Sequence, residues 1–196
     1  MTLIARVIAL TALLFTVVPP SQAAIIHYGT ALGPEAPGAT GSGFVTVDHD
    51  TDANTLLIKA TWSGLSGITT VAHIHCCTAA PGTGTVGVAV TPGTLPGFPV
   101  GVSEGSYTSP LLDLDDLDTF TAAFITTFAG GMLANADDAL IAGFNADLAY
   151  FNIHSSTFPG GEIRGFLQPL QIPEPATLVL LALGLAGLGL AGRRLR

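Results

Sequence analysis

"TLLIKATW", residues 55–62, places an apolar side chain at every second position. The apolar set is Leu56, Ile58, Ala60 and Trp62, whereas Lys59 and Thr61 fall between its members. Because successive side chains of a β-strand point to opposite faces, this alternation predicts a strand with one buried face. The fold class follows from whether the segments around it repeat the pattern.

The flanking segments do repeat it. "GFVTVDHD" (43–50) alternates in the same way, and the polar residues 48–54 between the two runs predict a hairpin loop. Glycine and proline divide the rest into short segments, which predict strands near 25–30, 69–75, 85–90, 105–112, 148–154 and 162–168. Phenylalanines at helical spacing predict a helix over 118–128, and two aspartates in a first turn favour another over 135–145. Seven or eight strands with turn-rich links indicate an all-β fold, an antiparallel sandwich with one or two short helices.

The charge of this central region excludes one class of partner. Between Ala24 and Ile172 there are two basic side chains, Lys59 and Arg164, against thirteen acidic ones, a formal charge of −11. A segment this acidic repels phosphate backbones, so nucleic-acid binding is excluded.

The N-terminus has the three parts of a secretory signal peptide. Residues 1–6 carry one positive charge, residues 7–18 form an apolar run, and Pro19-Pro20 breaks it. Ser21 and Ala23 supply the small residues that precede a cleavage site. We therefore predict a signal peptide over 1–23, cleaved after Ala23 or Ala24, and an exported domain over 24–170.

The C-terminus predicts a second targeting segment. A short linker (171–175) precedes an uncharged apolar run (176–192) near the lower length limit for a transmembrane helix, and a basic tail (193–196) follows. The positive-inside rule keeps that tail in the cytoplasm. The residues that define the segment are Pro173, Glu174, Pro175, Arg193, Arg194 and Arg196.

This tail resembles the PEP-CTERM sorting signal of Gram-negative bacteria. The resemblance implies an inner-membrane intermediate, cleavage by an exosortase-type membrane protease near the Pro-Glu-Pro, and delivery to the cell surface or the extracellular space. The alternative is a plain C-terminal membrane anchor. Both place the domain outside the cytoplasm.

Two short motifs carry a second resemblance. "AHIH" (72–75) and "YFNIHSSTFPGGEIRG" (150–165), together with "NTLLIKATWSGLSG" (54–67), resemble the CHRD domain first described in chordin. The resemblance spans roughly residues 26–169 and implies an immunoglobulin-like or superoxide-dismutase-like β-sandwich. It implies no reaction, because the biochemical activity of the family is not established. The family usually continues its His-x-His with Gly-Pro, whereas this chain has Cys76-Cys77.

The histidines of these two motifs allow two interpretations. His73 and His75 lie two apart on a predicted strand, so their imidazoles share a face about 7 Å apart. With His154 from the other motif they would form a three-histidine zinc or copper site with an open fourth position. The sequence favours the other interpretation, a hydrogen-bonded network that fastens the strands together and needs no cofactor.

The two cysteines, Cys76 and Cys77, are adjacent and leave three alternatives open. They form a vicinal disulfide that rigidifies the turn after the strand, they pair with another chain, or they stay as free thiols or metal ligands. A vicinal bridge is strained, because adjacent Cα atoms lie closer together than most disulfides allow.

Asn152, Glu162 and Arg164 complete the motif residues, and we assign them to a structural network. Arg164 is one of only two basic side chains in the domain, so we expect it to be paired with Glu162 or with an aspartate of a neighbouring strand. An anion-binding role for this arginine is the alternative, which nearby carboxylates oppose.

The sequence carries no motif of a known catalytic site. It lacks Gly-x-Ser-x-Gly, a P-loop, a dinucleotide fingerprint and His-Glu-x-x-His. We therefore expect a structural or interaction protein of the cell surface or extracellular matrix rather than an enzyme, with exopolysaccharide or other envelope components as partners. The alternative function is a metal-binding extracytoplasmic domain that uses His73, His75 and His154, redox-linked through Cys76 and Cys77.

Overall fold

The structure is a computed structural model that describes residues 24–170. The predicted signal peptide (1–23), linker (171–175), apolar helix (176–192) and basic tail (193–196) lie outside the described residues. Within 24–170, none of the helices has the length and apolar character that crossing a bilayer requires.

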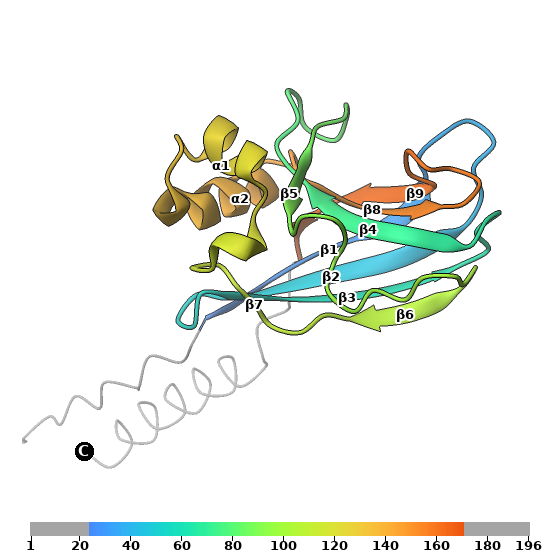
Figure 1. Ribbon diagram of the computed structural model, residues 1–196, viewed down its shortest axis with the longest axis horizontal. Helices are drawn as coiled ribbons and strands as arrows, with labels where there is room; N and C mark the ends of the chain where they lie inside the picture. Colours follow the sequence, from blue (N-terminus) through green and yellow to red (C-terminus); the bar gives the residue numbers. More distant parts are fainter. Residues whose placement is uncertain (1–23, 171–196) are drawn as a thin grey trace, which may run out of the picture.

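The described chain forms ten antiparallel strands (Figure 1). They are β1 (Ile25–Pro34), β2 (Ser42–Asp50), β3 (Thr55–Ser63), β4 (Thr69–His75), β5 (Val88–Val90), β6 (Gly105–Thr108), β7 (Leu112–Asp113), β8 (Tyr150–Ser155), β9 (Ile163–Phe166) and β10 (Gln168–Pro169). Hydrogen bonds join them in the order β5-β4-β8-β9-β1-β2-β3-β6, while β10 adds to β1 and β7 adds to β3. The predicted all-β, antiparallel class is confirmed.

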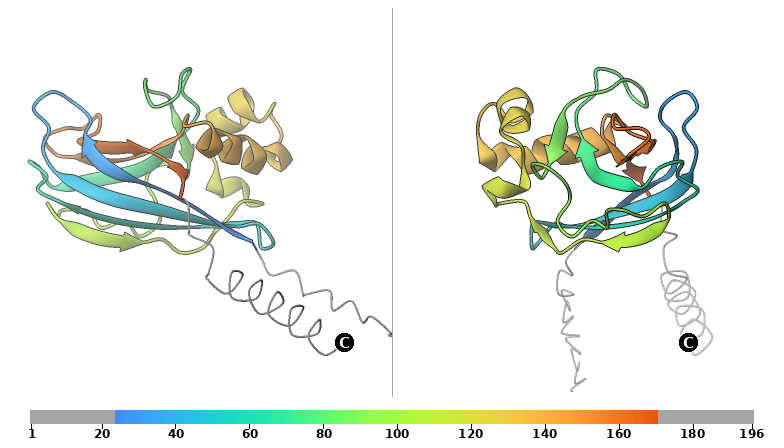
Figure 2. Two further views of the ribbon diagram at one scale, coloured as in Figure 1. Left: turned by 180° about the vertical axis from the view of Figure 1, so that it is seen from behind. Right: turned by 45° about the vertical axis from the view of Figure 1, so that its right-hand side comes forward.

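Strand β1 connects the two halves of the sheet. Most of its length pairs with β2, but its last residues, Gly33 and Pro34, pair with Arg164 and Ile163 of β9. The sheet therefore curls continuously, and the β4-β8-β9 half faces the β2-β3-β6 half as two layers of a sandwich do (Figures 1 and 2).

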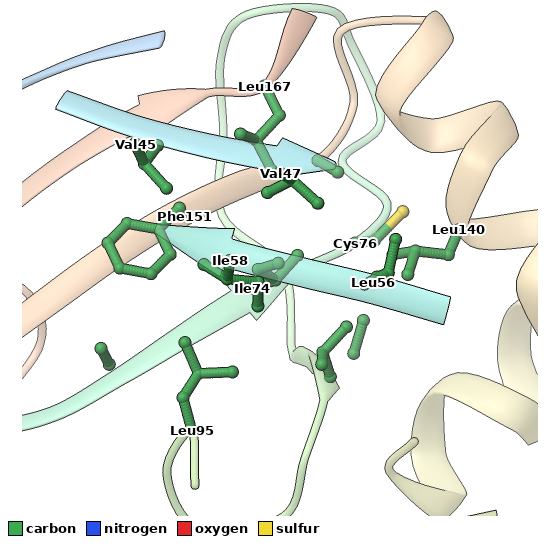
Figure 3. Close-up of a cluster of buried hydrophobic side chains, with 14 of the residues drawn as sticks. Val45, Val47, Leu56, Ile58, Ile74, Cys76, Leu95, Leu140, Phe151 and Leu167 are labelled. Carbon is green, nitrogen blue, oxygen red and sulfur yellow. The ribbon is translucent and has the colours of Figure 1, made fainter. Parts of the chain in front are cut away.

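The core lies between these two halves. Leu56, Ile58, Ala60 and Trp62 of β3 are at most 3% exposed, whereas Lys59 and Thr61 face solvent. Figure 3 shows side chains of β2 and β3 meeting side chains of β4 and β8, such as Ile74 and Phe151. The alternation in the opening segment is thus the core-facing pattern of one layer.

Two helices close one end of the sandwich (Figures 1 and 2). They are α1 (Ala122–Phe128) and α2 (Ala136–Asn145), preceded by 3-10 turns over Leu117–Thr119 and Leu133–Asn135. The Thr121 hydroxyl caps α1 by accepting a hydrogen bond from the Phe124 N–H at 3.2 Å. Phe124, Leu140 and Phe144 are buried against the sheet. Both predicted helices are present, slightly shorter than their predicted ranges.

The core packing generates a stability prediction. Phe151 is fully buried, so Phe151→Ala should lower the free energy of unfolding by about 3–5 kcal/mol through lost burial and a residual cavity. Phe44, which is 45% exposed, is the matched control, and its replacement by alanine should cost less than about 1 kcal/mol. Urea titration followed by circular dichroism measures both. Equal losses for the two variants would contradict this placement of the core.

Candidate metal centre

The pairing of β4 with β8 brings the two histidine motifs together. His73 lies opposite Asn152 and Val71 lies opposite His154, so the histidines occupy one face of the two strands. One ring nitrogen each from His73, His75 and His154 lies within 4.8 Å of the other two. Each of the three residues is buried, with at most 9% of its surface exposed.

A backbone carbonyl holds the outer nitrogen of each imidazole. The Gly93 carbonyl lies 2.6 Å from His73 Nε2, the Val86 carbonyl 2.8 Å from His75 Nδ1, and the Pro159 carbonyl 2.7 Å from His154 Nδ1. A carbonyl oxygen only accepts hydrogen bonds, so these nitrogens carry the N–H. The other nitrogen of each neutral ring then carries no proton, and its lone pair points inward. Metal-binding histidines are oriented by the same kind of outer hydrogen bond.

The inward nitrogens face other acceptors. His73 Nδ1 and His154 Nε2 are 3.3 Å apart, and His75 Nε2 is 3.2 Å from the Asn152 side-chain oxygen. Neutral His75 has one N–H for two acceptors, and the shorter contact, to Val86, takes it. Two lone pairs at this separation repel unless a proton or a cation lies between them. The centre is therefore lined by acceptors on its inner side.

Burial also disfavours protons at this centre. It lowers the pKa of His73 despite the hydrogen bond to Gly93. It lowers the pKa of His75 to about 4, with a further decrease from the neighbouring His73 and His154. Both rings are thus neutral near pH 7 and available as ligands. Nitrogen ligands of this kind suit zinc, copper, iron or nickel.

An aromatic stack covers the side of the centre away from the other histidines. The Tyr150 ring lies parallel to the His75 ring with centroids 4.6 Å apart, and the Arg164 guanidinium lies 5.1 Å from the Tyr150 centroid. Arg164 also donates to the Gly84 carbonyl at 2.9 Å. The guanidinium of Arg164 therefore packs on the ring that stacks against His75.

The expectation that Arg164 pairs with Glu162 or with an aspartate of a neighbouring strand was wrong. Its guanidinium pairs with Glu35, in the loop after β1, at 3.4 Å. Glu162 lies just before β9 begins, and its carboxylate turns to the backbone N–H and hydroxyl of Ser66, at 2.5 and 2.7 Å. Burial raises the pKa of Glu162, but hydrogen bonds from Ser155, Ser66 and Thr40 outweigh it and lower the pKa overall. Glu35 had no sequence signal, because neither periodicity nor a motif connects it to the histidines.

The two cysteines form a disulfide directly after β4 ends at His75. Cys76 is buried, and both sulfurs pack against α2 at Gly143, where an added Cβ would overlap Cys76 Sγ and lie 2.8 Å from Cys77 Sγ. Of the alternatives left open by the sequence, the structure contains the vicinal bridge. The sulfurs are therefore not thiolate ligands, and the candidate metal ligands are imidazoles.

A family model described as the CHRD domain matches residues 24–167. The chain belongs to the CHRD domain family. This match includes both histidine motifs and every residue of the candidate centre, so the centre is built entirely from the CHRD domain. No match was found to a curated protein or to a solved structure.

The segment after the CHRD domain matches a second family model, the PEP-CTERM protein-sorting motif, over residues 171–195. This motif marks the chain for export and for processing by exosortase, a membrane protein. The CHRD domain is therefore an exported domain followed by a sorting signal, as the sequence predicted.

The contact between the disulfide and α2 generates a prediction. Alanine in place of a helical glycine usually stabilises a helix by about 0.5–1 kcal/mol. Gly143→Ala should instead lower the free energy of unfolding by about 1–3 kcal/mol, because its methyl group would overlap the buried sulfurs. Exposed Ala142→Gly, in the same helix, is the reverse control and should cost only about 1 kcal/mol. Thermal denaturation of both variants measures the effect, and a stabilised Gly143→Ala protein would refute the contact.

Proposed function

We propose that this CHRD protein binds a first-row transition metal ion, zinc or copper(II), through His73, His75 and His154. The observation that supports it is the set of three buried imidazoles whose outer nitrogens are held by carbonyls and which bring one ring nitrogen each to within 4.8 Å of the others. A hydrogen-bonded network alone would alternate donors with acceptors, whereas this centre places acceptors against acceptors.

The ligand chemistry restricts the metal. Imidazole nitrogen favours zinc and copper over magnesium and calcium, which prefer oxygen ligands. The separation of 3.3 Å between His73 Nδ1 and His154 Nε2 is close to the spacing of two ligands about 2.0–2.1 Å from one tetrahedral metal. The three nitrogens together span up to 4.8 Å, so the proposal requires the imidazoles to close around the ion when it binds. The disulfide supports the turn after β4, and we assign it no redox step.

The mature protein acts, in this proposal, at the cell surface or in the extracellular matrix. An exosortase-type protease cleaves near Pro173-Glu174-Pro175 while the C-terminal segment is held as an inner-membrane intermediate. The support is the sorting motif over 171–195 together with the signal-peptide pattern over 1–23. The centre then operates outside the cytoplasm, where disulfides such as Cys76–Cys77 persist.

A structural or interaction role is the second candidate function. The outer face of β2, β3 and β6 has a shallow hollow lined by Phe44, which is 45% exposed, together with Lys59 and the hydroxyl-bearing residues Thr46, Thr61, Ser106 and Thr108. An exposed aromatic ring among hydroxyl groups suits contact with sugars, so exopolysaccharide or another envelope component fits this face. The domain needs no catalytic residues for either function.

Metal binding has a direct test. Metal-free protein titrated with Zn²⁺ should bind one ion per chain, and alanine at His73, His75 or His154 should weaken binding by at least about 100-fold. His27→Ala is the matched control, because His27 lies on β1 and pairs with Asp48 instead. Affinity should fall as the pH drops below the lowered pKa of His73 and on toward about 4, the pKa of His75, since protons then compete with the metal for the imidazoles. If the wild-type protein binds Zn²⁺ no better than a variant with alanine at all three histidines, the metal-binding proposal fails and the interaction role remains.

Processing of the tail has its own test. The intact mass of protein recovered from the cell surface should correspond to a chain that starts at Ala24 or Ile25 and ends near Pro175. Replacing Arg193 and Arg194 by alanine should leave the chain unprocessed, because both lie within the sorting motif. A surface protein that retains residues 176–196 would mean a simple membrane anchor.

A further inference from the structure

We propose that the side-chain oxygen of Asn152 is the fourth ligand of the metal centre. Glu35, held by Arg164, orients the Asn152 amide so that this oxygen points at the ion. This inference rests on the metal-binding function proposed above. The fourth coordination position, open in a three-histidine site, is then filled by a protein ligand that Glu35 and Arg164 hold in place.

The register of β4 and β8 places Asn152 in the middle of the three histidines. It lies directly opposite His73, precedes His154 by two residues on the same face, and is the neighbour of Tyr150, which lies opposite His75. Its side chain is 1% exposed. A buried amide must satisfy both its oxygen and its nitrogen within the protein.

Glu35 determines which way this amide points. Asn152 Nδ2 donates to Glu35 Oε2 at 3.2 Å. An ionised carboxylate only accepts hydrogen bonds, so the reverse orientation would set two acceptors against each other. The side-chain oxygen therefore points away from Glu35 and toward His75 Nε2, at 3.2 Å.

A metal ion accounts for that second contact. The His75 N–H is used by Val86, so the Asn152 oxygen faces a lone pair and lacks a donor. Two ligands bound about 2.0–2.2 Å from a tetrahedral ion lie about 3.3–3.6 Å apart. The contact of 3.2 Å to His75 and the contact of 3.3 Å between His73 and His154 are both close to this spacing.

Two further residues keep Glu35 in place. Arg164 contacts its other carboxylate oxygen at 3.4 Å, and both side chains are largely buried, at 22% and 10% exposure. Gly161 has a φ of 126° and leaves the space for this contact, since a Cβ there would overlap the Glu35 carboxylate and lie 3.0 Å from Asn152 Nδ2. The second glycine of the Gly-Gly-Glu motif thus makes room for the positioning hydrogen bond.

The proposed site has three neutral nitrogens, one neutral oxygen and a carboxylate one hydrogen bond further out. All four coordination positions are filled from the protein, which is typical of a metal-holding centre and not of one that activates water. The nearby carboxylate offsets the charge of the ion without touching it.

The test uses the full-length mature protein, Zn²⁺ affinity and the electron paramagnetic resonance spectrum of the Cu²⁺-loaded form. Asn152→Asp keeps the shape and makes the ligand oxygen a carboxylate oxygen, so it should shift the copper spectrum, but it also replaces the Nδ2 donor with an oxygen that faces Glu35 Oε2. Combined with Glu35→Gln, whose amide can donate to that oxygen, Asn152→Asp should bind Zn²⁺ at least about 10-fold more tightly than the wild-type protein. Asn152→Ala should weaken Zn²⁺ binding by about 10- to 100-fold. Glu35→Gln should weaken it about 10-fold, because its amide can donate to Asn152 and allow the side chain to turn over.

Matched controls separate ligation from folding. Asn135→Ala and Glu104→Gln lie on the surface and should leave affinity and spectrum unchanged. If Asn152→Ala fails to fold, the near-isosteric Asn152→Asp still decides the question. A copper spectrum identical in wild-type and Asn152→Asp protein would overturn the inference while leaving the three-histidine function intact. Wild-type protein that binds neither ion would overturn both, and a normal Glu35→Gln protein would overturn the positioning role.

Discussion

The antiparallel pairing of β4 with β8 is the constraint on which the site depends. With His73 opposite Asn152, all three histidines and the asparagine share one face. The chain between the two strands supplies two of the carbonyls that hold the outer nitrogens, and the turn after β8 supplies the third. A slip of one residue in this register would turn either strand's polar side chains to the other face. Core packing on the opposite face, through Ile74 and Phe151, prevents such a slip.

The same pairing explains why the surrounding residues have their particular chemistry. Buried polar groups are tolerated only with partners, and the outer side of the centre satisfies this rule through backbone carbonyls. On the inner side the ring nitrogens and the Asn152 oxygen face one another, and this arrangement is the basis on which we propose a cation site instead of a hydrogen-bonded network. The disulfide at Cys76 and Cys77 ends β4 directly beside His75 and packs on α2, so it connects the centre to the helical end of the sandwich.

Much of the fold was predictable because the relevant forces are local. Period-two burial in β3 and the polar loop before it located a hairpin, and helical spacing of phenylalanines located α1 within a few residues. The continuity of the sheet was not predictable, since it depends on the last two residues of β1 pairing with β9. The partner of Arg164 was missed for a similar reason: Glu35 lies 129 residues away and carries no pattern of its own.

The order of residues along the chain is sufficient to establish the all-β class, the charge, the export pattern and the candidate histidines, because each depends on neighbours within a few positions. Convergence of His73 and His75 with His154, orientation of the Asn152 amide by Glu35, and pairing of the cysteines with each other against α2 required the folded chain. These features depend on which groups meet across strands and on the direction in which each donor points. Long-range register and hydrogen-bond direction are properties of packing, and a linear pattern of residue types does not contain them.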